Sequence, residues 1–277
     1  MPLREREIDE IIQVVTDRPY WGGGGRIFDA LGIGDNWNVN RRANGALREH
    51  LRQLGDDQTE ALLSYFDLRH HEHNDPVWPI KGLRLFVSHR DEQRANLALL
   101  GTALQRYGIA AFFAHDAIVA GRDWRGELLR GLGSMHALLA YCSPNFSGSD
   151  WTAQEVGFAF GKGVPVVSIL AGENPTGFLE QWQGIRGVVN SEDTARNIAE
   201  SVFERLSAAD AAKEPLSEGL APRLKFAGSF DAAGFISDRL VQVGRLSPVA
   251  AQTIRIAQAA NNQVGINAEL LALLGEE

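Results

Sequence analysis

The chain has 277 residues, a formal net charge of −8 and 44% hydrophobic residues, enough to bury one large core or to fold as up to three domains. The acidic balance disfavours general nucleic-acid binding, because it provides no excess of cations to neutralise phosphates. No apolar run approaches the ~18 residues that a membrane-spanning helix needs, so we expect no membrane partner.

Residues 1–80 are predicted to be a mostly helical N-terminal region. Three segments fit the 3.6-residue period, 6–15, 41–54 and 58–66, and a stretch with two prolines, NDPVWPIKG (74–82), ends the region. The first fifteen residues are charged and amphipathic and lack the apolar centre of a signal peptide, which predicts a cytoplasmic protein.

Two motifs in this region invite functional interpretations that the sequence does not favour. The run GGGG at 22–25 follows no apolar strand and lacks the GK[ST] of a phosphate-binding loop, so a plain loop is favoured. His70, His71 and His73 are accompanied by neither HExxH nor a CxxC pair, and a solvated turn is favoured over a metal site.

Between residues 82 and 206, short apolar runs alternate with helical patterns. The runs predicted as strands are LRLFVS (83–88), IAAFF (109–113), ALLAYC (137–142), VPVVSIL (164–170) and GVVN (187–190). Strands that are apolar throughout and alternate with helices indicate a parallel sheet covered on both faces. The predicted fold class is therefore α/β, a five-stranded doubly wound domain.

The only cysteine of the chain, Cys142, lies inside the third of these runs. A single cysteine excludes an intramolecular disulfide, and in the middle of a strand it behaves as a small apolar side chain. This cysteine usage also suits a reducing cytoplasm.

The remainder of the chain is predicted to be a second linker followed by a small helical region, 222–277. The linker is the proline-containing stretch AAKEPLSEGLAP (211–222). Three short helices are expected over 229–244, 247–262 and 267–274, and Ser247-Pro248 is a typical helix start.

Polar side chains follow three of the predicted strands. In doubly wound sheets, ligands bind beyond the carboxyl ends of the strands. That rule selects 88–91 (SHRD), 114–116 (AHD) and 143–145 (SPN). We expect substrate-binding residues among them, including Ser88, His89 and Ser143, and an arginine at position 90 suits a phosphate.

Glu155 lies in a predicted helix that begins near Asp150, four residues after Trp151. One interpretation is structural, because Thr152-x-x-Glu155 has the capping-box spacing and glutamate is common in a helix's first turn. The other is a catalytic carboxylate, with Asp150 or Ser149 serving as the N-cap instead.

Several ordered motifs between residues 82 and 206 carry a family resemblance. LFVSH (85–89), AHDAIVAGRDW (114–124), LLAYCSPNF (138–146) and SDWTAQE (149–155) resemble, in order, the first box, the loop after the second strand, the third strand and the W-x-x-x-E helix of Toll/interleukin-1 receptor (TIR) domains. The resemblance implies a flavodoxin-like fold for this domain. It says nothing about residues 1–80.

The resemblance also implies a function, since enzymatic TIR domains cleave the bond between nicotinamide and ribose in NAD+ and some cyclise the ADP-ribose. The essential carboxylate of that branch corresponds to Glu155. Arg90 corresponds to a phosphate-contacting position, Asp116 to an acidic position in the loop, and Trp151 to a residue able to stack on nicotinamide. His89 stands where many members have tyrosine, and Asp91 where some have a second basic residue.

The resulting expectation is a NAD+ glycohydrolase, with NAD+ as substrate and no cofactor or metal, acting as a triggered effector in bacterial antiphage defence. Self-association through the TIR domain is expected, because a neighbouring subunit often completes such sites through the loop corresponding to 114–123. Two alternatives stay open: a non-catalytic TIR adaptor for signalling and assembly, and a sensor that binds a nucleotide without cleaving it.

Overall fold

The computed structural model describes residues 8, 48–49, 51–53, 77–78, 80–113, 124–181, 183–225, 227, 229–264 and 267–275. The chain divides into two compact units, one of residues 76–78 and 82–216 and one of residues 1–75, 79–81 and 217–277. The glycine run at 22–25 and the histidines at 70, 71 and 73 lie outside the described residues.

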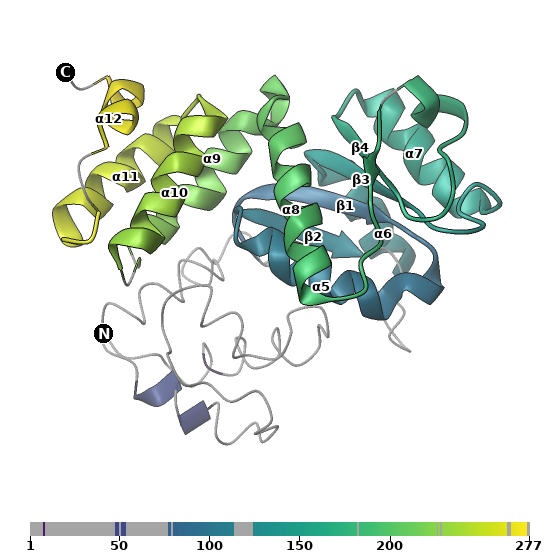
Figure 1. Cartoon of the computed structure of the whole chain (residues 1–277), viewed down its shortest axis with the longest axis horizontal. Coiled ribbons are helices and arrows are strands. Elements are labelled where there is room, and N and C mark those ends of the chain that lie inside the picture. Colours follow the sequence, from purple (N-terminus) through teal and green to yellow (C-terminus); the bar gives the residue numbers. More distant parts are fainter. Residues whose placement is uncertain are drawn as a thin grey trace. The chain divides into compact units, whose positions relative to one another are not determined.

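A five-stranded parallel sheet forms the centre of the first unit (Figure 1). Its strands are β1 (Leu83–Ser88), β2 (Ile109–Phe113), β3 (Ala137–Cys142), β4 (Val166–Leu170) and β5 (Ile185–Arg186). Their order is β2-β1-β3-β4-β5, and every neighbouring pair is parallel. This order is that of flavodoxin-like folds, so the predicted fold class is confirmed.

Four helices cover the sheet, two on each face. They are α5 (Arg94–Gln105), α6 (Trp124–Ser134), α7 (Asp150–Lys162) and α8 (Glu192–Ser207). Helices α5 and α8 pack together on one face, and α6 and α7 pack together on the other (Figure 1). Two 3₁₀ turns complete the described part of the unit, η2 (Asp91–Gln93) and η4 (Gly177–Gln181).

Burial on both faces explains why the strands are apolar throughout. All six residues of β3 are buried, and Tyr141 is the largest fully buried side chain of the described residues. Its hydroxyl is satisfied by the backbone N–H of Val189, which donates to it at 3.0 Å. The central strand is therefore a packed core element, and the ligand-accessible polar groups can lie only at its ends.

The fifth strand is shorter and earlier than the sequence predicted. GVVN (187–190) was the expected strand, but β5 is Ile185–Arg186, paired with Ile169 and Leu170 of β4. Beyond Leu170, β4 turns away at Gly172, so the residues after Gly187 have no strand edge to pair with. The prediction of 187–190 is therefore wrong: the strand begins two residues and ends four residues before the predicted one.

The predicted linker 211–222 is also wrong, because these residues lie within helix α9 (Asp210–Leu224). A proline inside a helix costs about 3 kcal/mol. Here Ala212, Leu216 and Leu220 recur every four residues and are fully buried. Each buried leucine contributes about 1.5–3 kcal/mol, so packing outweighs the local signal of the prolines.

Three more helices follow in the second unit, as predicted: α10 (Phe230–Val243), α11 (Pro248–Ala260) and α12 (Ala268–Leu274). Ser247 caps α11 by accepting from the backbone N–H of Ala250 at 3.1 Å, with proline in the first turn. The side-chain amide of Asn261 donates to the carbonyls that end α9, those of Leu224, Lys225 and Ala227. Of the helices expected in residues 1–80, only Ile8 and parts of 48–53 are described, with Leu51 and Ile8 buried.

Candidate active site

The connections of the sheet create a topological switch point at the carboxyl ends of β1 and β3. The chain leaves β1 toward α5 on one face and leaves β3 toward α7 on the other. Neighbouring strands whose connections diverge in this way form the switch point where open α/β sheets bind ligands. Ser88 ends β1, and Ser143 directly follows β3, so both predicted residues lie at this switch point.

Glu155 reaches the same place from α7. The hydroxyl of Ser88 donates a hydrogen bond of 2.5 Å to Oε2 of Glu155, joining residues 67 positions apart in the chain. Only 2% of Glu155 is exposed, although it is a carboxylic acid in the second turn of a surface helix. The structure thus brings together two of the residues that the sequence selected.

Glu155 does not cap its helix. Helix α7 begins at Asp150, and the N-cap is Ser149, whose side chain accepts from the backbone N–H of Thr152 at 3.4 Å. The hydroxyl of Thr152 donates to the carbonyl of Phe146 at 2.7 Å. The capping-box interpretation of Thr152 and Glu155 is therefore wrong, because Thr152 itself occupies the third helical position.

Burial changes the protonation of Glu155. Desolvation raises the pKa of Glu155 from 4.5 to about 7, while the hydrogen bond from Ser88 acts in the lowering direction. No Lys, Arg or His within the described part of the chain forms an ion pair with this carboxylate. An acidic group buried without a cation is costly, and such groups gather at functional sites.

Ser143 adds a second polar group to the switch point. It is buried to 1% exposure, and its hydroxyl oxygen has no hydrogen-bond partner among the described residues. Buried hydroxyls are normally satisfied by protein or water. This hydroxyl can therefore bind a ligand atom that reaches the switch point.

The two residues that follow β1, His89 and Arg90, lie in different surroundings. The ring of His89 is buried edge-on against Phe113, with centroids 5.8 Å apart, and its Nδ1 donates to the carbonyl of Val87 at 3.0 Å. Arg90 is partly exposed, and its Nε lies 3.7 Å from Oε2 of the exposed Glu92. The weak surface pair leaves the Arg90 guanidinium available to an anion, whereas the His89 ring packs in the core.

Trp151 and Asp116 complete the predicted set. Trp151 precedes Glu155 by one helical turn and is 43% exposed. Asp116 lies outside the described residues, as does the rest of the loop 114–123.

One residue at this edge was missed by the sequence analysis. Glu173 follows β4, and its carboxylate accepts hydrogen bonds from the backbone N–H groups of Phe146 and Ser147, at 3.0 and 2.9 Å. The rule that points to the carboxyl ends of the first three strands selects Glu173 when it is applied to the fourth. No spacing in the sequence reveals that its partners lie 26 and 27 residues away.

Comparison with known protein families agrees with this architecture. Residues 85–206 match the family model described as the TIR domain. Residues 85–206 form a TIR domain. No curated protein and no solved structure matched the chain.

The TIR family includes members that cleave NAD+ and members without catalytic activity. The match therefore shows a TIR domain and supports a signalling or NAD+-cleaving function in general, and the chemistry has to be argued from the site.

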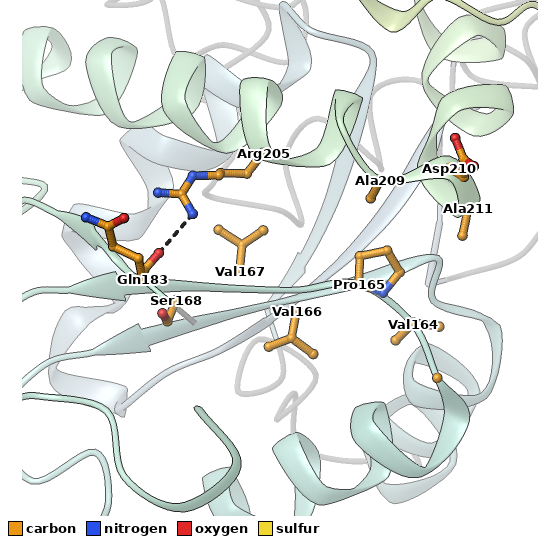
Figure 2. Close-up of a pocket in the computed structure, with 11 residues that line it drawn as sticks. Val164, Pro165, Val166, Val167, Ser168, Gln183, Arg205, Ala209, Asp210 and Ala211 are labelled. Carbon is orange, nitrogen blue, oxygen red and sulfur yellow. Dashed lines mark hydrogen bonds between the residues drawn. The ribbon is translucent and has the colours of Figure 1, made fainter. Parts of the chain in front are cut away.

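The TIR domain also has a pocket of about 420 Å³ at a different place (Figure 2). Figure 2 shows β4 with Val166 and Val167 pointing to opposite sides, and Arg205 of α8 donating to the carbonyl of Gln183, a bond of 2.9 Å. The pocket is lined by 163–168, the amino-terminal half of β4 and the residues before it, and by the junction of α8 and α9. It lies away from Glu155 and contains none of the predicted site residues.

Within the described residues, no helix is long and apolar enough to cross a membrane. The same residues contain no cluster of three or more His, Cys, Asp or Glu side chains with the arrangement of a metal site.

Proposed function

We propose that the TIR domain hydrolyses the bond between nicotinamide and ribose in NAD+, with Glu155 as the catalytic carboxylate. The observation that carries the proposal is the position of this group, buried at the switch point and held by the Ser88 hydroxyl at 2.5 Å. A capping role does not explain the position, because Ser149 and not Glu155 caps the helix.

The chemistry requires only one carboxylate. Nicotinamide leaves as a neutral molecule from a positively charged ring, so no general acid has to protonate it. Bond cleavage leaves an oxocarbenium-like ribose, which a fixed negative charge stabilises. In a site with little water this stabilisation is larger than in solution, and the burial of Glu155 provides such surroundings.

Other residues at the switch point suit the remaining parts of NAD+. The unpartnered hydroxyl of Ser143 is placed to bind a ribose hydroxyl or the nicotinamide amide. Arg90 supplies a cation for the diphosphate, and exposed Trp151 supplies an aromatic face for nicotinamide. Both His89 and Asp116 keep their predicted roles in substrate binding only as proposals, and the buried ring of His89 favours a supporting position.

The cellular role belongs to the same proposal. We place the protein in the cytoplasm as a self-associating effector of bacterial antiphage defence, whose helical flanks respond to a trigger. Support for self-association is the common behaviour of TIR domains. The product is ADP-ribose or its cyclic form.

The decisive experiment incubates NAD+ with concentrated protein and measures nicotinamide by chromatography. Glu155→Gln keeps the size of the side chain and an acceptor for Ser88 but removes the charge. We expect nicotinamide release to fall by a factor on the order of 10² or more, as for the loss of other preorganised electrostatic partners. Glu204→Gln, at an exposed glutamate of α8, is the matched control and should retain the wild-type rate.

Three outcomes would contradict the proposal. A folded Glu155→Gln protein with the wild-type rate would exclude Glu155 as the catalytic group. A wild-type protein that binds NAD+ in equilibrium dialysis without releasing nicotinamide would be a nucleotide sensor, and one that neither binds nor cleaves it would be an adaptor.

A further inference from the structure

The loop between β3 and α7 determines where the site residues lie. Ser143 begins this loop, and Ser149 ends it as the N-cap of the helix that carries Glu155. A displacement of the loop therefore moves the Ser143 hydroxyl and the start of α7 together. Residues 143–149 are held by hydrogen bonds within the loop, by a contact with α7, and by contacts from the turn after β4, 171–173.

The centre of these contacts is the carboxylate of Glu173. Oε2 accepts from the backbone N–H of Phe146 at 3.0 Å, and Oε1 accepts from that of Ser147 at 2.9 Å. The preceding residue, Asn145, has a φ of 64°, and a left-handed residue in such a loop turns successive N–H groups toward one point. The loop thus forms a nest for an anion, and Glu173 fills it.

Glu173 keeps its charge in this position. Hydrogen bonding from the Ser147 side chain, and then from the backbone N–H groups of Ser147, Phe146 and Asn145, lowers the pKa of Glu173 below its ordinary value. The carboxylate is therefore ionised at neutral pH, where charge-assisted hydrogen bonds are stronger than neutral ones.

The backbone of Glu173 is itself fixed against the same loop. The N–H groups of Ala171 and Glu173 both donate to the carbonyl of Cys142, at 3.0 and 3.1 Å. Between them, Gly172 has a φ of 123°, and a Cβ atom there would lie 3.0 Å from Cδ of Pro144. Only glycine fits this approach, so the turn sits close against the loop and aims the carboxylate at the nest.

The opposite side of the loop contacts the catalytic helix. The carbonyl of Phe146 accepts from the hydroxyl of Thr152 at 2.7 Å, and Thr152 precedes Glu155 by three residues in α7. Phe146 thus donates its N–H to both Glu173 and the carbonyl of Ser143, and its carbonyl accepts from the first turn of α7. Thr152 is fully buried, so this connection is not a surface contact that water replaces easily.

We propose that Glu173 is a positioning residue of the site, whose carboxylate fixes the loop 143–149 and so aligns the Ser143 hydroxyl and the Glu155 carboxylate. It does not touch the reacting atoms. Its effect on turnover rests on the proposed NAD+ cleavage, whereas its effect on the loop can be measured without any activity.

The test compares Glu173→Ala and Glu173→Gln with the control Glu180→Ala in the full chain. Glu180 also accepts a backbone N–H, that of Gly177 at 3.1 Å, but within its own turn. Hydrogen–deuterium exchange should increase in Glu173→Ala over residues 144–152 and stay unchanged over α9 and α10. The kcat for nicotinamide release should fall by a factor of roughly 10–10², because small displacements in an active site have effects of this size. KM should change less than kcat.

Glu173→Gln keeps one acceptor oxygen and loses the charge. Its kcat and its hydrogen–deuterium exchange should therefore lie between those of wild type and Glu173→Ala. Exchange over 144–152 that is unchanged in Glu173→Ala, or increased equally throughout the chain, would overturn the proposal. A loosened loop with an unchanged kcat would overturn the positioning role and leave a structural one. If wild type releases no nicotinamide, the proposed function fails, and the exchange arm alone decides whether Glu173 holds the loop.

Discussion

The two ends of the sheet differ in the surroundings of their ionisable side chains. At the amino ends, His136 accepts from the backbone N–H of Arg84 at 3.2 Å, and Lys162 donates to the carbonyls of Leu132, Gly133 and Met135. At the carboxyl ends, Glu155 is buried without a cation, and the Ser143 hydroxyl has no partner among the described residues.

The protonation states follow this difference. At the amino ends, desolvation, together with Arg84 and Lys162, lowers the pKa of His136 to about 4, so the imidazole is neutral and its hydrogen bond is satisfied. At the carboxyl ends, desolvation raises the pKa of Glu155 to about 7, where a charge remains possible but costly. Desolvation thus keeps His136 neutral at one end and makes Glu155 titrate near neutral pH at the other.

The largest stability effect is expected for Glu155→Gln at alkaline pH. A glutamate in the unfolded chain ionises near 4.5, whereas Glu155 in the folded chain ionises near 7. The free energy of unfolding of the wild type therefore falls as the pH rises from about 4.5 to 7, by a total of about 3 kcal/mol. Glutamine cannot ionise, so at pH 8.5 the variant should be more stable than wild type by an amount of this order.

Denaturant unfolding at pH 5 and pH 8.5 measures the effect. At pH 5, both proteins should have free energies of unfolding within about 1 kcal/mol of each other, because little of the ionisation cost has appeared. A Glu155→Gln protein that is equally destabilised at both pH values would mean that Glu155 is an ordinary structural residue.

At the amino ends, Lys162→Met should lower stability without affecting the chemistry. The ammonium group satisfies carbonyls at the C-terminus of α6, where a cation also interacts favourably with the helix dipole. Its removal should cost about 1–2 kcal/mol in urea unfolding. The pH dependence of nicotinamide release should remain that of wild type.

Lys213→Met is the matched control, since Lys213 forms a surface ion pair with Asp210 at 2.8 Å. Such pairs contribute at most about 1 kcal/mol, so this variant should be the more stable of the two. An altered pH profile in Lys162→Met would break the contrast between the two ends of the sheet.

The smallest effect is expected for Ser88→Ala, as a change in pH dependence. The hydroxyl lowers the pKa of Glu155, so its removal should raise that pKa and move the acid limb of the pH–rate profile to higher pH. Ser168→Ala is the control, because Ser88 and Ser168 both pair in register with Ala140. An acid limb that moves equally in both variants, or in neither, would contradict a specific role of Ser88.

The strands at the centre of the sheet could be predicted from the sequence because both of their faces are buried. β1, β2 and β3 have the predicted boundaries, and each is apolar nearly throughout. β5 could not be predicted in the same way, because its two residues are defined by pairing with Ile169 and Leu170. Helix α9 was missed because its prolines suggest a linker, and only tertiary burial overrides that local signal.

The candidate site was predictable in part. Glu155 and Ser88 were each selected by motif and by strand end, but no sequence pattern indicates that they share a hydrogen bond across 67 residues. Thr152 suggested a capping box, because the helix could begin at any of several polar residues. The hydrogen bond from the backbone N–H of Thr152 to the Ser149 side chain shows that Ser149 is the N-cap, which excludes that capping box. Glu173 has no local signature, since its role depends on two backbone N–H groups in a distant loop.

The nest filled by Glu173 also limits which ligands suit this edge of the sheet. Empty nests and helix N-termini in α/β proteins are common cradles for phosphate. Here the cradle after β3 already holds a carboxylate, so a phosphate group that approached it would meet a filled cradle and like charges. If NAD+ is the substrate, as proposed, we expect its cationic nicotinamide ring to lie toward Glu155 and its diphosphate toward Arg90. The charge of Glu173 would then distinguish the two parts of the same molecule.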